Sequence, residues 1–172
     1  FAKYSSFWIC LALVLVTAMV YFQVRSFDFI NYDDPGYVSE NPNIQKGITL
    51  EAVKWAFTAG HMGNWHPLTW FSHMLDWQLF GSNAGGHHLT NLIFHIANTL
   101  LIFIVLKIMT QKPWPSAFVA MLFALHPLHV ESVAWIAERK DVLLTVFFLL
   151  SVISYIYYLE KKDKKYYYIS IL

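Results

Sequence analysis

The sequence predicts an all-α protein embedded in a membrane as a polytopic helix bundle, with about four spans and the start of a fifth. Hydrophobic residues make up 57% of the 172 residues and charged residues only 13%, a balance that soluble domains of this length rarely show. Several long stretches carry no charge at all and can cross a bilayer as helices. A single cysteine, Cys10, cannot form a disulfide framework, and a net charge of +1 argues against nucleic-acid binding.

Uncharged stretches locate the spans. Between Lys3 and Arg25 lie 21 residues without Asp, Glu, Lys or Arg, which is about 31 Å of helix at 1.5 Å per residue. A cleaved signal peptide is the competing interpretation, but the apolar run is longer than a usual signal sequence and lacks a small-x-small cleavage site. The third stretch is short and flanked by prolines, so it needs a tilted or kinked continuation through Val130. The expected spans are residues 7–24, 88–106, 114–130 and 142–159.

The distribution of charge gives the orientation. With four spans, one side of the membrane holds seven basic and two acidic residues, and the other side holds five basic and nine acidic residues. Lysine and arginine favour the cytoplasmic side, so we expect the N-terminus inside and two outer loops, residues 25–87 and 126–141. The sequence lacks an initiator Met and ends in the apparent start of another apolar segment. We therefore expect residues 1–172 to be the N-terminal part of one transmembrane domain of a longer protein.

The first outer loop is longer than a plain connection requires, and we expect it to carry one or two short helices at the membrane interface. Thr49 can cap the first of them, with Glu51 in its first turn. The other helix is expected to begin after Pro67 and to end at Gly81. The apolar stripe of the first helix would consist of Leu50, Val53 and Phe57.

A polar stripe runs through the second span. His88, Asn91, His95 and Asn98 follow one another at helical spacing, which places them on one face. Polar groups that face lipid are costly, so the stripe should face protein or a water-filled cavity. Two interpretations stay open: hydrogen bonding between helices, favoured for Asn98, and lining of a cavity by the other three residues.

Both outer loops also carry carboxylates. Asp33 and Asp34 follow the first span, and Glu131 lies in the second outer loop between apolar residues. One carboxylate can act as a general base, while a second group holds a phosphate through a metal ion or through Arg139. The simpler alternative is that Asp33-Asp34-Pro-Gly36 forms an ordinary solvated turn.

The second outer segment allows a similar pair of interpretations. If it is helical after His129, Glu131 and Glu138 are seven residues apart and share a helix face. Alternatively, Glu138 is part of a solvated helix and pairs with a neighbouring Arg139 or Lys140.

Four motifs, in order along the chain, resemble the N-terminal half of the TMTC-type transmembrane O-mannosyltransferases. They resemble still more closely the bacterial membrane proteins that join such a module to tetratricopeptide repeats. Both groups are GT-C-type polytopic glycosyltransferases, and the resemblance covers most of the chain. The motifs are Asn31-Tyr-Asp-Asp-Pro-Gly-Tyr37, Asn64-Trp-His-Pro-Leu-Thr-Trp70, Gly86-His-His-Leu-Thr-Asn91 and Leu125-His-Pro-Leu-His-Val-Glu-Ser-Val-Ala-Trp135.

The resemblance implies transfer of a sugar, with mannose one candidate, from a polyprenyl-phosphate-linked donor to a protein or glycan acceptor on the outer face. It places Asp33 at the catalytic base and Asp34 at the second acid, and which of the two is the base stays open. Glu131 falls at a second acidic motif and Arg139 at a basic residue that contacts the donor phosphate. Glu138 stands where animal members tend to have glycine, which leaves the type of acceptor open.

Further roles complete the expected site. A divalent cation, Mg²⁺ or Mn²⁺, would be held by Asp34 and Glu131. His126 and His129 are additional candidates for the donor phosphate or a metal. The residues expected to line the cavity are Tyr37, His66, His88, Asn91 and His95.

Two other classes of function stay open. One is a non-enzymatic multi-pass scaffold, which would tolerate alanine at the acidic and histidine positions. The other is a haem- or metal-binding membrane protein that uses His95 with His126 and His129 as ligands. In every case we expect a multi-pass membrane protein, in the plasma membrane of a bacterium or the endoplasmic reticulum membrane of a eukaryote.

Overall fold

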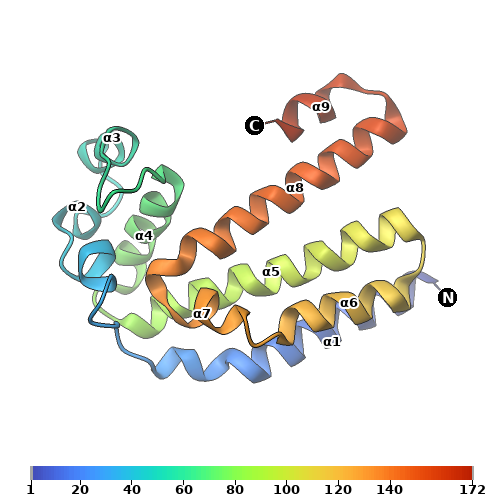
Figure 1. Ribbon diagram of the computed structural model, residues 1–172, viewed down its shortest axis with the longest axis horizontal. Coiled ribbons are helices and arrows are strands. Elements are labelled where there is room, and N and C mark those ends of the chain that lie inside the picture. The colour runs from blue at the N-terminus through green and yellow to red at the C-terminus, as the bar shows by residue number, and fades with distance from the viewer. Residues whose placement is uncertain (1, 172) are drawn as a thin grey trace. The chain divides into compact units, whose positions relative to one another are not determined.

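A computed structural model describes residues 2–171, with side chains from Ser5 onward, and shows a helical chain (Figure 1). Its residues cluster into two compact units, which are described one at a time. The first unit contains the described residues up to Val20, Phe94–His129 and those from Val142 onward. The second contains Tyr21–Ile93 and Val130–Asp141.

Within the described residues, three helices are long and apolar enough to cross a membrane. They are α1 (Ala2–Tyr21), which the 3₁₀ turn η1 (Phe22–Ser26) prolongs, α5 (Ala84–Thr110) and α8 (Arg139–Lys161). These helices contain the first, second and fourth predicted spans. The expectation of an all-α membrane helix bundle is therefore confirmed.

The third predicted span differs from the expectation. Helix α6 (Pro113–Leu125) has 13 residues, about 20 Å at 1.5 Å per residue. The expected helical continuation through Val130 is wrong, because the chain bends after α6 and a separate short helix, α7 (His129–Ala134), follows. Proline disfavours helical geometry in the residue before it, and His126, before Pro127, is extended with φ −69° and ψ 129°.

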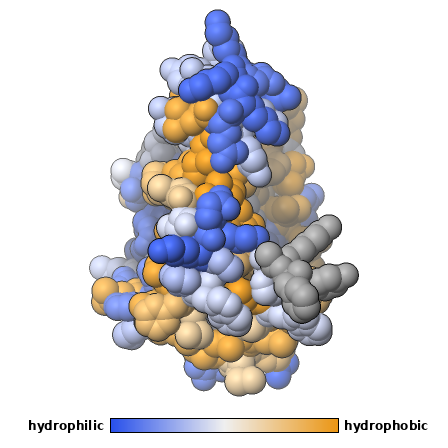
Figure 2. All heavy atoms as spheres, turned by 90° about the vertical axis from the view of Figure 1, so that its right-hand side faces the viewer, coloured by the Kyte–Doolittle hydropathy of each residue, from blue (hydrophilic) through white to orange (hydrophobic). Residues whose placement is uncertain are grey.

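In the first unit, α1, α5 and α6 pack through a small apolar cluster. Lys107 on α5 also donates a hydrogen bond of 2.8 Å to Ser6 Oγ on α1. Helix α9 (Lys164–Ser170) folds back along α8 (Figure 1), and Ser151 Oγ donates to the carbonyl of Ser170. Hydrophilic residues gather where α8 turns into α9, above a band of hydrophobic residues (Figure 2). The apolar cluster consists of Ile9, Leu13, Phe103 and Ala120.

The first outer loop lies in the second unit and holds more structure than the one or two helices expected. The predicted cap is confirmed, because Thr49 Oγ1 accepts a hydrogen bond of 3.2 Å from the N–H of Ala52. The predicted end at Gly81 is also confirmed, since this glycine follows the last helical residue with a φ of 57°. The elements are a π-helical turn η2 (Pro35–Ser39) and helices α2 (Pro42–Gln45), α3 (Leu50–Thr58) and α4 (Pro67–Phe80).

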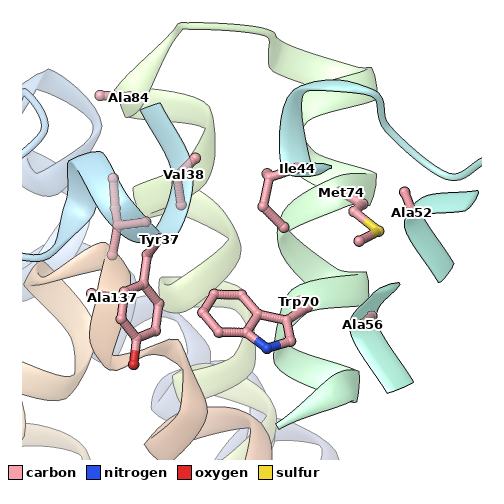
Figure 3. Close-up of a cluster of buried hydrophobic side chains, with 10 residues drawn as sticks. Tyr37, Val38, Ile44, Ala52, Ala56, Trp70, Met74, Ala84 and Ala137 are labelled. Atoms are coloured by element: carbon pink, nitrogen blue, oxygen red, sulfur yellow. The ribbon is translucent and has the colours of Figure 1, made fainter. Parts of the chain in front are cut away.

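The core of this unit forms around α4 (Figure 3). Trp70 and Met74 are fully buried and pack against residues of η2, α2 and α3. The face of α3 that packs is not the expected stripe, because Leu50 is 88% exposed while Ala52 and Ala56 are buried. Two alanines one turn apart allow close approach of the neighbouring helix, which the longer side chains would prevent.

Candidate functional site

The two adjacent aspartates lie at the start of η2, in the second unit, and occupy different environments. Asp34 is fully buried, whereas Asp33 is partly exposed. Pro35 begins the helical turn, and the N–H of Tyr37 donates to the backbone carbonyl of Asp33 at 2.9 Å. The two neighbouring side chains therefore differ in their exposure to solvent.

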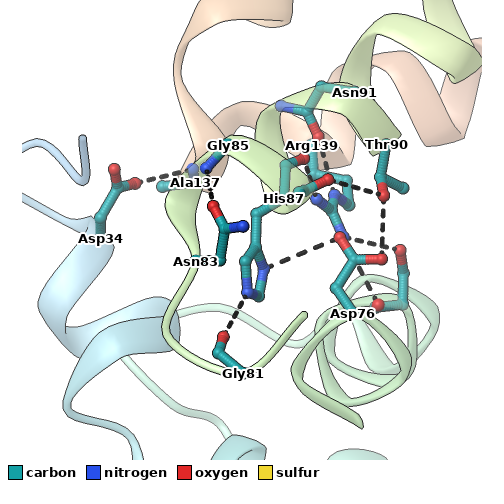
Figure 4. A network of polar contacts seen from close by, with 12 residues as sticks. Asp34, Asp76, Gly81, Asn83, Gly85, His87, Thr90, Asn91, Ala137 and Arg139 are labelled. Carbon is teal, nitrogen blue, oxygen red and sulfur yellow. Dashed lines mark hydrogen bonds and ion pairs between the residues drawn. The ribbon is translucent and has the colours of Figure 1, made fainter. Parts of the chain in front are cut away.

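The carboxylate of Asp34 forms hydrogen bonds to two segments that are far apart in the sequence. Its Oδ2 accepts a hydrogen bond of 2.8 Å from the N–H of Ile30. Its Oδ1 accepts one of 2.9 Å from the N–H of Ala137 (Figure 4). Burial raises the pKa of Asp34, and the two N–H donors and the nearby Trp135 indole oppose that rise. Both oxygens are used in backbone contacts, so Asp34 holds the first outer loop to the second outer segment.

Asp33 lies one helical turn before Tyr37, whose N–H donates to the Asp33 carbonyl. Burial raises the pKa of Tyr37, the charge of Lys140 lowers it, and those of Asp33 and Glu138 raise it. Lys140 Nζ lies 5.8 Å from the centre of the Tyr37 ring and 2.6 Å from Glu138 Oε1. Asn64 Nδ2 donates to the Tyr37 hydroxyl at 3.0 Å. An ammonium group therefore faces the Tyr37 ring, and an amide binds its hydroxyl.

Two aromatic rings lie close to the ring of Tyr37. The Tyr37 ring lies 4.8 Å from that of Trp70 and 5.6 Å from that of His66, measured between centroids. Burial and the charge of Lys140 lower the pKa of His66, so its imidazole is neutral near pH 7. Tyr37 and His66, both predicted to line a cavity, are thus brought together.

Arg139 occupies a different place from the one expected of a residue that contacts substrate. Its guanidinium is fully buried and forms an ion pair of 2.6 Å with Asp76 Oδ2 on α4. Its Nε donates to Asn91 Oδ1 at 2.7 Å, and its Nη2 donates to the carbonyl of His87 at 2.7 Å (Figure 4). Its Nη1 also donates to Ser72 Oγ at 3.2 Å. These contacts join α4, α5 and α8, and each nitrogen of the guanidinium already has a partner.

Asp76 is the central acceptor of this network and was not among the expected site residues. Thr90 Oγ1 donates to its Oδ1 at 2.9 Å, and His87 Nδ1 lies 3.7 Å from its Oδ2. The signal in the sequence was the polar face of an otherwise apolar helix, which also includes Ser72. Buried polar residues in such a helix need partners, so this face pointed to an internal network.

The second outer segment does not form the single helix expected to follow His129. That helix stops at Ala134, Trp135 is extended with φ −109° and ψ 121°, and a 3₁₀ turn η3 (Ile136–Glu138) follows. The expectation that Glu131 and Glu138 share one helix face is therefore wrong. Within residues 2–171, the exposed Glu131 side chain makes no hydrogen bond or ion pair, whereas the predicted pair between Glu138 and Lys140 is confirmed.

The polar stripe of α5 is buried and bonds to backbone carbonyls. His88 Nε2 donates to Asp28 at 3.3 Å, and Asn91 Nδ2 to Trp135 at 3.0 Å. In the first unit, His95 Nε2 donates to Ala124 at 3.0 Å, and Asn98 Nδ2 to Val142 at 2.8 Å. These contacts support hydrogen bonding between segments for all four residues, rather than the lining of an open cavity.

The other two histidines expected at the site, His126 and His129, lie in the first unit. The rings of His95 and His129 are 5.7 Å apart, and those of His129 and His126 are 6.1 Å apart. His95 Nε2 is already bonded to Ala124, and His126 Nδ1 accepts a hydrogen bond of 3.3 Å from the N–H of Leu128. The part of the chain from 2 to 171 holds no group of three or more His, Cys, Asp or Glu residues that could bind a metal ion.

Comparison with known proteins finds similarity to a small part of several curated proteins. Protein O-mannosyl-transferase Tmtc2 of Drosophila melanogaster is 27% identical over 162 residues, which is 90% of this chain and 17% of that protein. Protein O-mannosyl-transferase TMTC2 of Homo sapiens is 31% identical over 144 residues, 80% of this chain and 17% of that protein. Protein O-mannosyl-transferase TMTC1 of Mus musculus is 34% identical over 136 residues, 72% of this chain and 14% of that protein. No family model matches, and no solved structure is significantly similar.

Proposed function

Because the chain is a homologue of part of the TMTC protein O-mannosyl-transferases, a GT-C-like group, we propose that the full-length protein is a membrane glycosyltransferase. It transfers a sugar, with mannose the first candidate, from a polyprenyl-phosphate-linked donor to a protein acceptor on the extracytoplasmic face. The chain spans only 17% of the length of two of these relatives, so later segments complete the active centre.

The observation that carries this proposal is the different placement of the two aspartates. Asp34 is buried and bonded to two backbone N–H groups, whereas Asp33, one helical turn before Tyr37, is partly exposed. A general base needs access to its substrate and a free oxygen. Asp33 meets both requirements, and we assign it as the base.

The reaction follows from this assignment. Asp33 accepts the proton of an acceptor hydroxyl, whose oxygen attacks the anomeric carbon of the donor sugar. The bond between that carbon and the phosphate oxygen breaks, and the phosphate leaves with the electron pair and an increased negative charge. Attack from the side opposite the phosphate inverts the configuration, and a nearby cation stabilises the leaving phosphate.

The two acids expected to hold Mg²⁺ or Mn²⁺ do not fit a cation site in this arrangement. Both oxygens of Asp34 accept backbone hydrogen bonds, and Glu131 is exposed. A divalent cation needs several oxygen ligands that converge on one point. No step of the proposed reaction therefore passes through a metal ion.

Sugar transfer by the full-length protein in proteoliposomes tests the proposal, with polyprenyl-phosphate mannose as donor. Asp33→Asn is expected to lower kcat by about 100-fold or more at an unchanged melting temperature, because general-base catalysis contributes about 10²–10⁴-fold. Asp34→Asn is expected to lower the melting temperature, and Glu131→Gln is the matched control with little effect on either. A folded Asp33→Asn variant with full activity contradicts the assignment of the base, and a wild-type protein that transfers no sugar contradicts the function.

A further inference from the structure

The second unit carries five lysine and arginine residues, and they differ in how far their charges are already paired. Arg139 is buried and surrounded by acceptors, as described above. Lys46 forms an exposed ion pair of 3.0 Å with Glu51. Lys140 is the member of this set whose ammonium group lies over the Tyr37 ring, 5.8 Å from its centre. The five residues are Arg25, Lys46, Lys54, Arg139 and Lys140.

The ion pair between Lys140 and Glu138 leaves hydrogen-bonding capacity unused. The two side chains are 35% and 16% exposed, so the pair is much less solvated than the one between Lys46 and Glu51, at 42% and 76%. An ammonium group has three N–H donors, and within the described residues Glu138 Oε1 is the one acceptor bonded to Lys140 Nζ. Two donors therefore stay available for oxygen atoms of an anion.

The position of Lys140 also matches what the proposed reaction requires. Lys140 faces the Tyr37 ring, and Asp33 lies one helical turn before Tyr37, whose hydroxyl accepts a hydrogen bond from Asn64. A displacement reaction needs a base where the acceptor is deprotonated and a positive charge where the leaving group becomes negative. One of these residues can serve as the base, and another can supply the positive charge.

We propose that Lys140 binds the phosphate group of the polyprenyl-phosphate-linked donor, and that the phosphate replaces Glu138 as the partner of its ammonium group. This inference rests on the proposed function and assigns the donor phosphate to Lys140 instead of Arg139. Glu138 holds the lysine side chain in place when no donor is bound. In the complex, the two free N–H donors and the released third donor contact phosphate oxygens.

Binding of decaprenyl phosphate, the carrier without its sugar, to the full-length protein in nanodiscs tests this proposal. Lys140→Met keeps the length of the side chain and removes its charge, and it is expected to weaken binding by about 10- to 100-fold, the range for loss of a charged hydrogen bond. Lys140→Arg is expected to bind within a few-fold of wild type, because it keeps the charge. Lys46→Met, at the exposed pair in the same unit, is the matched control and should bind like wild type. Wild-type affinity in Lys140→Met overturns the proposal.

Glu138→Gln separates donor binding from a purely structural ion pair. If Glu138 competes with the phosphate, its neutral variant binds decaprenyl phosphate several-fold more tightly than wild type. If the pair only stabilises the fold, Glu138→Gln and Lys140→Met lower the melting temperature equally and neither changes affinity, which overturns the proposal. Should Lys140→Met fail to fold, Glu138→Gln decides alone, since unchanged or weaker binding also overturns it.

Failure of this inference can be distinguished from failure of the proposed function. A wild-type protein that transfers sugar, with a Lys140→Met variant that binds the carrier normally, refutes the phosphate site and keeps the transferase. A wild-type protein that binds the carrier through Lys140 and transfers no sugar to any acceptor refutes the transferase and supports the phosphate site. A wild-type protein that does not bind decaprenyl phosphate refutes the phosphate site regardless of transfer.

Discussion

Removal of the charge on Asp76 tests whether the buried ion pair with Arg139 holds the second unit together. Asp76→Asn keeps the size of the side chain and one oxygen that can accept from Thr90. It takes away the only carboxylate paired with Arg139 among the described residues. The guanidinium would then stay buried with neutral acceptors alone, those of Asn91, His87 and Ser72.

The expected cost follows from the burial of both partners, which are 0% and 3% exposed as side chains. Removing one member of a buried ion pair costs about 3–5 kcal/mol, because an uncompensated charge is left in a poorly solvated place. The hydrogen bonds to neutral acceptors persist, so the loss should fall at the lower end of this range. An exposed ion pair contributes at most about 1 kcal/mol, because water and salt screen both charges.

The free energy of unfolding of the full-length protein, measured by denaturant titration in mixed detergent micelles, checks this difference. Asp76→Asn should lower it by about 3 kcal/mol, whereas the control Glu51→Gln at the exposed pair with Lys46 should leave it nearly unchanged. The combination Asp76→Leu with Arg139→Met should recover much of the loss, because no charge remains buried. Equal stability of Asp76→Asn and Glu51→Gln would refute the structural role of this pair.

Three further outcomes are expected in the second unit. Burial lowers the pKa of His73 well below 6.5, so the unfolded chain binds a proton first and stability falls as the pH drops through 6.5. His73→Phe should reduce this loss in melting curves at pH 5 to 7.5, and an unchanged pH dependence contradicts it. Burial raises the pKa of Asp34, so the contribution of Asp34 to stability falls as the pH rises from about 4 through the raised pKa of the folded state. Asp34→Asn should flatten the dependence of stability on pH in this range, and a pH profile identical to that of the wild type counts against this expectation. A Cβ at Gly85 would lie 2.2 Å from the backbone oxygen of Arg25, so Gly85→Ala should cost about 1–3 kcal/mol in chemical denaturation. Gly60→Ala, where no atom lies within 4 Å, is its control, and equal stability of the two variants argues against the close approach.

Much of the helical architecture was predictable because its signals are local. The apolar runs of α1, α5 and α8 are set by the free energy of transfer of successive residues, which each run carries by itself. The cap at Thr49 and the end of α4 at Gly81 also depend on residues within one turn. The end of α6 was missed because Pro127 permits either a kinked continuation or a stop, and packing decides between them.

The candidate site was only partly predictable, because its roles depend on residues far apart in the chain. The sequence identified Asp33 and Asp34 as candidate site residues but could not show which one is buried, since they are neighbours of the same type. The two aspartates differ because Asp34 accepts a hydrogen bond from the N–H of Ala137, which lies 103 residues away in the sequence. Arg139 was expected to contact substrate, and only its pairing with Asp76 shows that its charge is already matched.

By itself, then, the sequence determined that this protein is a membrane-embedded helical bundle with acidic and polar residues in the segments between its long apolar helices. Hydropathy and capping act over a few residues, so no knowledge of the fold was needed for that conclusion. The tertiary structure alone decided which polar groups are consumed in buried contacts and which stay accessible. Buried polar groups must find partners wherever the folded chain brings them, so Asp34 and Arg139 are paired across distant segments, whereas Asp33 stays partly exposed.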